Sequence, residues 1–339
     1  MKRAPKILGI HLISVFSITL IAVILRAIAS ATSYDRLTGY YDSRFLITLA
    51  NCIAALACVI SLAYLILKSA TPKYLACFQH PMVYVPSGVC SVALIFFSAD
   101  KLRTLADLPY GIMSRITLSN PENIITIIMT VLAFASIGYF VLAHMIEERR
   151  SMLRSIFGIV LVAFLSACAL DIYFFSDAPI NSLCKITDQI AFCVAGLFFL
   201  FDTRISLDRE IWSGYIAFGS FAAVLTAYSS IPALAVYLIN GTLLSESLFD
   251  IILMFTLFIA IAARLILTAM LPEDKRCETA EAIIQLSSER SEYIDQAIHA
   301  RAYALSKMEE SEPEEEVDDN YTIDLDTPNT TSDESEDTL

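Results

Sequence analysis

Residues 121–143 read PENIITIIMTVLAFASIGYFVLA, and this stretch decides the fold. It contains no charged residue after Glu122, and it is slightly longer than the roughly 20 residues that an α-helix needs to cross a hydrocarbon core about 30 Å thick. Asn120 is a good capping residue, Pro121 suits a first helical position, and Glu122 complements the helix dipole. The stretch therefore predicts a transmembrane helix that begins at Pro121.

Similar apolar stretches recur along the chain. The predicted spans are 7–31, 45–67, 82–99, 121–143, 153–175, 183–201, 212–230 and 249–271. Each must be helical, because backbone polar groups in lipid can be satisfied only within the segment. The sequence thus predicts an all-α, polytopic transmembrane bundle of about eight spans over residues 1–271.

The composition agrees with a lipid environment. Of the 339 residues, 56% are hydrophobic and 17% are charged, compared with about 25% charged residues in an ordinary soluble domain. The formal net charge is −13, but residues 309–339 hold 14 of the 36 acidic residues and no Lys or Arg. The acidic balance therefore describes a C-terminal tail and not an acidic binding cleft.

The Lys and Arg residues in the loops predict the orientation. Loops on the side of the termini carry 12 of them, and the opposite loops carry six. Because positively charged loops stay in the cytoplasm, we expect both termini to be cytoplasmic and the protein to lie in a bacterial plasma membrane.

The N-terminal segment has a second interpretation as a signal peptide. Lys2, Arg3 and Lys6 precede an apolar run that ends at Ala29-Ser30-Ala31, which resembles a cleavage site. The run from Ile7 to Leu25 is 19 residues long, whereas signal peptides usually have about 7–15 apolar residues. This length favours an uncleaved first helix.

Residues 231–244, IPALAVYLINGTLL, are apolar but too short to cross a membrane. Pro232 is expected to separate them from the seventh span. They predict either a re-entrant hairpin or a helix on the outer membrane surface, and the surface helix is favoured because re-entrant segments are rarer.

The chain changes character after Leu271. Residues 272–308 are predicted to form a cytoplasmic amphipathic helix, over about 278–308, and residues 309–339 are too polar to bury a core and are predicted to be disordered. The region 278–339 could dock a cytoplasmic protein or support homo-oligomerisation. Alternatively, the helix packs on the inner loops or the membrane surface.

Ionisable residues near the predicted outer ends of the spans are candidate ligand-binding groups, because charges at membrane depth are expensive. They are Arg26, Asp100, Asp171, Asp188 and Asp250. If their helices are neighbours, four carboxylates could surround one guanidinium in an outward-facing pocket suited to a cationic ligand, a proton or an ion. The alternative is that each residue caps a helix or extends to the interface.

Three further polar groups, Arg264, His11 and Asn51, lie elsewhere within the spans. Arg264 is close enough to the inner end for its long side chain to reach water, and a contact with Asp202 or Glu147 would be a structural ion pair. No acidic residue lies at the centre of a span, which weighs against a proton-coupled pump.

The eight cysteines form no C-x-x-C pair, and we interpret them as small buried hydrophobic residues. They are Cys52, Cys58, Cys77, Cys90, Cys168, Cys184, Cys193 and Cys277.

Two short segments, YDRLTGYY at 34–41 and FLFDTR at 199–204, resemble segments of other membrane proteins. The first resembles a D-x-x-T-G-aromatic loop that follows the first helix in bacterial polytopic membrane proteins of uncharacterised function. The resemblance implies a similar helical membrane fold. It implies no activity and no site residues.

Motifs for known chemistry are missing from the sequence. His144 and Glu147 lack the second histidine of a zinc protease motif, and there is no G-x-S-x-G elbow or phosphate-binding loop. We therefore expect no metal and no cofactor. The absence of a basic stripe argues against nucleic-acid binding.

These observations favour a non-catalytic sensor or accessory subunit that acts through its cytoplasmic tail. A small-solute or ion transporter or channel that uses the outer carboxylates is the first alternative. An intramembrane enzyme assembled from scattered residues is the second.

Overall fold

The structure is a computed structural model that describes residues 4–35, 40–66, 81–106, 121–145, 152–176, 179, 182–207, 211–241, 247–270, 292–303 and 307. The chain divides into two units, Met1–Ala280 and Glu281–Leu339. The first unit holds all the helices that are long enough to span a membrane among those described.

Eight described helices are long and apolar enough to cross a bilayer. They are α1 (Ala4–Ser33), α2 (Arg44–Ala63), α3 (Pro81–Ala106), α5 (Pro121–Met145), α6 (Met152–Phe175), α7 (Leu183–Ser206), α8 (Trp212–Asn240) and α9 (Leu248–Met270). Each predicted span falls on one of them, and α5 begins at Pro121 as expected. The predicted all-α polytopic bundle is therefore confirmed.

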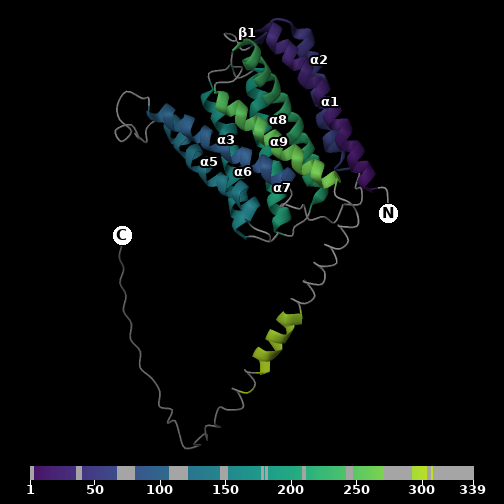
Figure 1. Cartoon of the computed structure of the whole chain (residues 1–339), viewed down its shortest axis with the longest axis vertical. Helices are drawn as coiled ribbons and strands as arrows, with labels where there is room; N and C mark the ends of the chain where they lie inside the picture. The colour runs from purple at the N-terminus through teal and green to yellow at the C-terminus, as the bar shows by residue number, and fades with distance from the viewer. Residues whose placement is uncertain are drawn as a thin grey trace, which may run out of the picture. The chain divides into compact units, whose positions relative to one another are not determined.

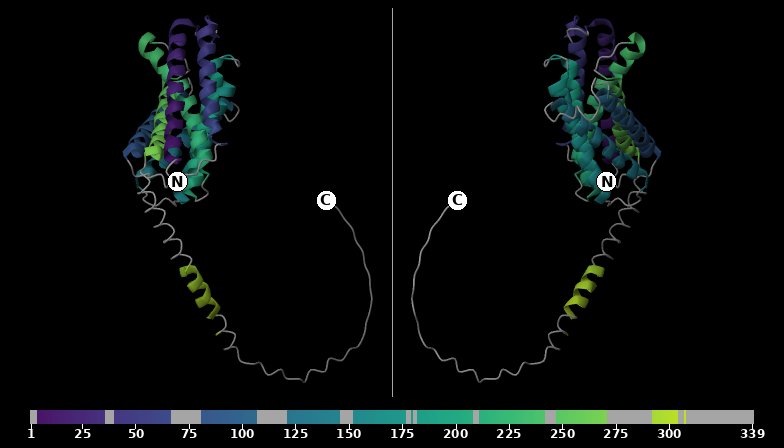
Figure 2. Two further views of the ribbon diagram at one scale, coloured as in Figure 1. Left: turned by 90° about the vertical axis from the view of Figure 1, so that its right-hand side faces the viewer. Right: turned by 90° about the vertical axis from the view of Figure 1, so that its left-hand side faces the viewer.

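The centre of the bundle is formed by the last three helices. α8 packs against α1, α2, α7 and α9, and α3 packs against α9 (Figure 1). Phe198 and Phe199 on α7 and Tyr215 on α8 are fully buried there. α1 and α2 pack side by side, as the left panel of Figure 2 shows, and they lie at the right-hand edge of the bundle in Figure 1. Outward apolar side chains such as Ile13 and Val131 are exposed, as expected for surfaces that lipid solvates.

The prediction of a separate segment at 231–244 is wrong for the residues that the structure describes. α8 continues through Pro232 to Asn240, where Gly241 ends it in a left-handed conformation with φ of 66°. α8 therefore runs for 29 residues, about 43 Å at 1.5 Å per residue. Residues 242–246 lie outside the described part.

A short hairpin follows α1. Its strands are β1 (Tyr34–Asp35) and β2 (Tyr40–Tyr41), which pair in antiparallel register with Tyr34 opposite Tyr41. We call the end of the bundle that carries this hairpin the hairpin end. Residues 36–39, which complete the D-x-x-T-G motif, lie outside the described residues.

In the second unit, residues 292–303 form a helix whose described side chains are all exposed. Tyr293, Ile294, Ile298 and Tyr303 are among them. The rest of the predicted amphipathic helix, apart from Lys307, and the whole acidic tail lie outside the described residues, so those predictions remain untested.

Candidate functional site

Arg26 lies inside the bundle near the hairpin end, with only 2% of its surface exposed. Its Nη1 donates to the carbonyl oxygen of Tyr228 on α8 at 2.9 Å, and its Nη2 donates to Sγ of Cys184 on α7 at 3.6 Å. The guanidinium carbon also lies 4.4 Å from the centre of the Tyr228 ring. Arg26 thus joins α1 to α7 and α8.

Pro232 explains why the carbonyl of Tyr228 is free to accept a hydrogen bond from Arg26. A proline has no N–H, so Pro232 cannot donate to the carbonyl of Tyr228, four residues earlier in α8. In a membrane, such a freed carbonyl needs a partner from another helix. Arg26 supplies that partner, which is why α8 can continue where the sequence predicted a break.

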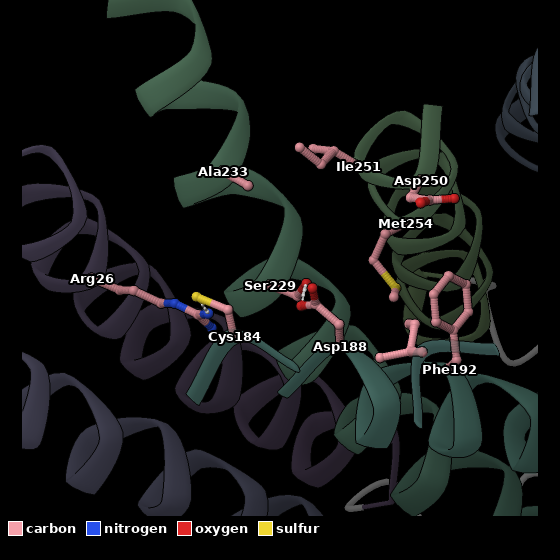
Figure 3. A pocket seen from close by; sticks show the side chains of 10 residues that line it. Arg26, Cys184, Asp188, Phe192, Ser229, Ala233, Asp250, Ile251 and Met254 are labelled. Carbon is pink, nitrogen blue, oxygen red and sulfur yellow. Dashed lines mark hydrogen bonds between the residues drawn. The ribbon is translucent and has the colours of Figure 1, made fainter. Parts of the chain in front are cut away.

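Asp188 on α7 lies on the other side of a small cavity from Arg26 (Figure 3). Its Oδ1 accepts a short hydrogen bond from Ser229 Oγ on α8. No carboxylate of the described residues lies within the 4.0 Å ion-pair distance of the Arg26 guanidinium. The Arg26 guanidinium and the Asp188 carboxyl group therefore share a cavity without pairing directly.

The cavity has a volume of about 20 Å³, which is enough for about one water molecule or a small charged group. Its remaining walls come from α6, α7, α8 and α9, and they are apolar apart from Asp250, Cys184 and Ser229. Figure 3 shows Asp250 and Met254 on the α9 side, farther from Arg26 than Asp188.

The hairpin adds polar contacts beside the cavity. The Tyr41 hydroxyl lies 2.9 Å from Ser30 Oγ and 3.8 Å from Cys184 Sγ. Its ring lies 5.1 Å from the ring of Tyr34. Burial raises the pKa of Tyr41 to about 12, so the phenol is neutral at physiological pH. Asn51 on α2 is linked to Arg26 only through Tyr228, because its Oδ1 accepts a 2.5 Å hydrogen bond from the Tyr228 hydroxyl.

Three of the five predicted site residues line the cavity. Arg26, Asp188 and Asp250 line the same cavity, whereas Asp100 and Asp171 do not. Asp171 pairs with Lys101 at 3.2 Å, and Asp100 accepts a 2.9 Å hydrogen bond from Ser247. The structure therefore does not place four carboxylates around one guanidinium.

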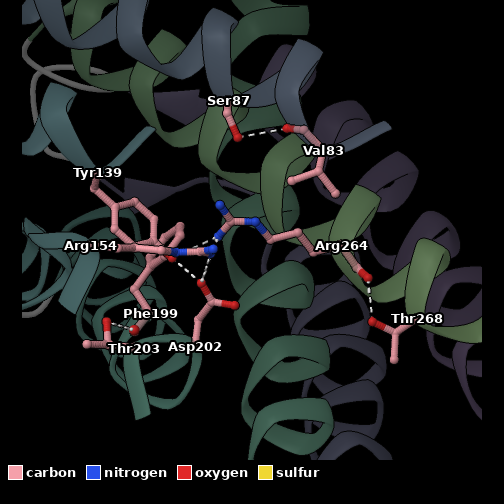
Figure 4. A network of polar contacts seen from close by, with 9 residues as sticks. All are labelled: Val83, Ser87, Tyr139, Arg154, Phe199, Asp202, Thr203, Arg264 and Thr268. Atoms are coloured by element: carbon pink, nitrogen blue, oxygen red, sulfur yellow. Dashed lines mark hydrogen bonds and ion pairs between the residues drawn. The ribbon is translucent and has the colours of Figure 1, made fainter. Parts of the chain in front are cut away.

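A second buried polar cluster surrounds Asp202, near the end of α7, whereas Asp188 lies near the start of that helix (Figure 4). Oδ2 of Asp202 on α7 pairs with Arg154 on α6 at 3.3 Å and with Arg264 on α9 at 3.5 Å. The same oxygen accepts a short hydrogen bond from the Tyr139 hydroxyl on α5, which lies 3.3 Å from Arg264 Nη1. The cluster thus joins four helices.

This cluster contains the ion pair between Arg264 and Asp202 that the sequence suggested. Glu147, the other suggested partner, lies outside the described residues. The expectation that Arg264 reaches water is wrong, because only 2% of its surface is exposed. Among the described residues, Nε and Nη2 of Arg264 and Oδ1 of Asp202 have no hydrogen-bond partner, so the cluster carries a desolvation cost.

The cysteine prediction holds in part. Cys90 and Cys168 are buried, whereas Cys52 and Cys193 are exposed. Cys184 is buried but is not merely a hydrophobic filler, because Arg26 and Tyr41 contact its sulfur. This contact was not predicted from the sequence. The one feature that pointed to it was the position of the cysteine at the start of a span, beside Lys185.

His11 on α1 is also buried. Its ring lies 4.9 Å from that of Tyr64, and its Nε2 has no hydrogen-bond partner in the part of the chain that the structure describes. Within the described ranges, no three His, Cys, Asp or Glu residues are grouped so that they could hold a metal ion.

Comparisons with family models, curated proteins and solved structures find no match to this chain.

Proposed function

We propose that the protein is a non-catalytic membrane sensor that binds a small charged solute or ion between Arg26 and Asp188. In this proposal the hairpin end faces outward from a bacterial plasma membrane, and both termini are cytoplasmic, as the Lys and Arg distribution in the loops suggests. Binding in the cavity shifts α9, and this shift signals to the C-terminal segment.

The observation that carries the proposal is the relation between Arg26 and Asp188. A buried guanidinium without an ionic partner is costly in a low-dielectric bundle. Arg26 and Asp188 nevertheless line one cavity without an ion pair. A small solute or ion in the cavity could interact with both residues and offset that cost.

In this proposal, α9 connects the cavity to the C-terminal segment. Asp250 and Met254 line the cavity near the start of this helix, and Arg264 joins the Asp202 cluster near its end. Asp250 and Arg264 are about 21 Å apart along the helix axis, at 1.5 Å per residue. Any shift of α9 on binding would therefore act on the Asp202 ion pairs before the chain continues into the C-terminal segment.

Transport is the second candidate. Asp188 and Asp202 lie on the same helix, one beside the cavity and the other in the buried cluster. In a transporter, the Asp202 cluster would act as a closed inner gate beneath an outer site. Uptake by liposomes that contain the purified protein would distinguish transport from sensing.

The binding site is tested by thermal unfolding of the full chain in lipid nanodiscs. Ammonium chloride and sodium chloride, whose cations are small enough for a cavity of about one water molecule, serve as probes, with choline chloride as the reference salt. We expect at least one probe to raise Tm in the wild type and in Asp171→Asn, which changes a carboxylate outside the cavity, but not in Asp188→Asn or Arg26→Gln. The absence of a shift in the wild type, or an equal shift in all variants, would overturn the proposal.

A further inference from the structure

Cys184 combines burial with direct contact to a cation. Only 6% of its surface is exposed, and Arg26 Nη2 donates to its sulfur at 3.6 Å. The Tyr41 hydroxyl lies 3.8 Å from the same sulfur. Three groups able to donate a hydrogen bond, on Arg26, Tyr41 and Tyr34, therefore surround one thiol.

The contact between Arg26 and Cys184 matters because of the other groups that surround the guanidinium. Arg26 has no carboxylate within ion-pair distance in the described part of the chain, and its buried Nε has no hydrogen-bond partner. Its guanidinium therefore lacks an anionic partner, and the Cys184 sulfur is a contacting atom that can become negatively charged. Peroxides react with the thiolate form of a cysteine, and the Arg26 guanidinium donates to the sulfur atom that would carry that charge.

Small molecules could reach this thiol through the cavity. Cys184, Arg26 and Asp188 all belong to the cavity lining, as Figure 3 shows. A volume of about 20 Å³ favours very small reagents. Hydrogen peroxide meets this requirement, and because it is uncharged it avoids the cost of bringing another ion into the bundle.

We propose that Cys184 is a reactive thiol that small neutral peroxides oxidise to sulfenic acid. The Cys184 thiolate attacks one peroxide oxygen, so that an S–O bond forms and the O–O bond breaks. The sulfur loses two electrons, and the peroxide is reduced to hydroxide, which takes a proton to become water. This reactivity does not depend on the proposed sensing of a solute.

Cys90 and Cys168 provide internal controls. They are 0% and 3% exposed, comparable with Cys184, but neither accepts a hydrogen bond from a guanidinium in the described part of the chain. If burial alone determined the reaction rate, all three cysteines would be oxidised slowly. The Arg26 contact predicts that Cys184 is oxidised faster than the other two.

The experiment treats the full chain in nanodiscs with hydrogen peroxide and stops the reaction with catalase at set times. The protein is then unfolded in dimedone, which traps sulfenic acid, and each cysteine peptide is quantified by mass spectrometry. We expect Cys184 to be oxidised at least about ten times faster than Cys90 and Cys168.

Arg26→Gln should lower the Cys184 rate about tenfold, whereas Arg26→Lys should retain part of it. Arg44→Gln, which removes an exposed arginine at the hairpin end, is the matched control and should leave the rate unchanged. The wild-type comparison requires no variant to fold. Equal rates for the three cysteines in the wild type would overturn the proposal, as would an unchanged Cys184 rate in folded Arg26→Gln.

Discussion

Arg26 on α1 donates a 2.9 Å hydrogen bond to the carbonyl oxygen of Tyr228 on α8. This carbonyl is the one that Pro232 leaves without its usual helical donor. A proline on one helix therefore creates the acceptor that fixes a buried arginine on another helix. The same arginine lines the cavity and contacts Cys184, so the backbone defect and the candidate site depend on each other.

This relation predicts energetic coupling between Arg26 and Pro232. Arg26→Leu should lower the free energy of unfolding by about 1–3 kcal/mol, because it leaves a buried carbonyl without a partner. In a Pro232→Ala background, the alanine N–H can donate to Tyr228, so the same change should cost less. A double-mutant cycle in mixed micelles should give a coupling of at least about 0.5 kcal/mol. Additive effects would show that the two residues are independent.

The Asp202 cluster should be important for stability. Asp202→Asn removes the shared anionic partner of Arg154 and Arg264, and should lower the free energy of unfolding by about 3–5 kcal/mol. Asp171→Asn breaks the partly exposed pair with Lys101 and should cost about 0–1 kcal/mol. Denaturant titration followed by circular dichroism would measure both. Similar costs for the two variants would contradict the assignment of Asp202 as a structural centre.

The contact between α6 and α7 requires a glycine. A Cβ at Gly158 would collide with the Thr203 side chain, whereas a Cβ at Gly9 would meet nothing within 4 Å. Gly158→Ala should therefore lower Tm, with a cost of about 1–3 kcal/mol, and Gly9→Ala should not. Thr203→Ala should restore part of the loss in the double variant. Equal Tm values for the two alanine variants would argue against this close approach.

The orientation can be tested with reporter fusions. Green fluorescent protein fused after Leu339 should fluoresce, because we expect the C-terminus in the cytoplasm. Alkaline phosphatase inserted between Asp35 and Tyr40 should be active, because we expect the hairpin outside. The reverse pattern would place the Arg26 cavity on the cytoplasmic side and would exclude an external ligand.

The sequence was sufficient to predict all eight spans, because length and hydropathy are local properties of each segment. The predicted break at Pro232 was wrong for a nonlocal reason. Whether a proline ends a membrane helix depends on whether its freed carbonyl finds another donor, and that donor, Arg26, is 202 residues from Tyr228 in the sequence.

The candidate site could be predicted only in part. Hydropathy and charge were enough to select Arg26, Asp188 and Asp250, which do line one cavity. They could not separate these residues from Asp100 and Asp171, because that distinction depends on which helices are neighbours. Cys184 was missed for the same reason, since nothing near it in the sequence indicates the contact with Arg26.

The most direct test of the account is whether the cavity between Arg26 and Asp188 accepts a small polar group. Ala233 lines this cavity, whereas Ala227, on the same helix and 1% exposed, does not. Each would be replaced by cysteine, treated in nanodiscs with hydrogen peroxide, unfolded in dimedone to label sulfenic acid, and quantified by peptide mass spectrometry. The account predicts rapid labelling of Ala233→Cys and little labelling of Ala227→Cys. Equal labelling, or none at Ala233→Cys, would contradict it.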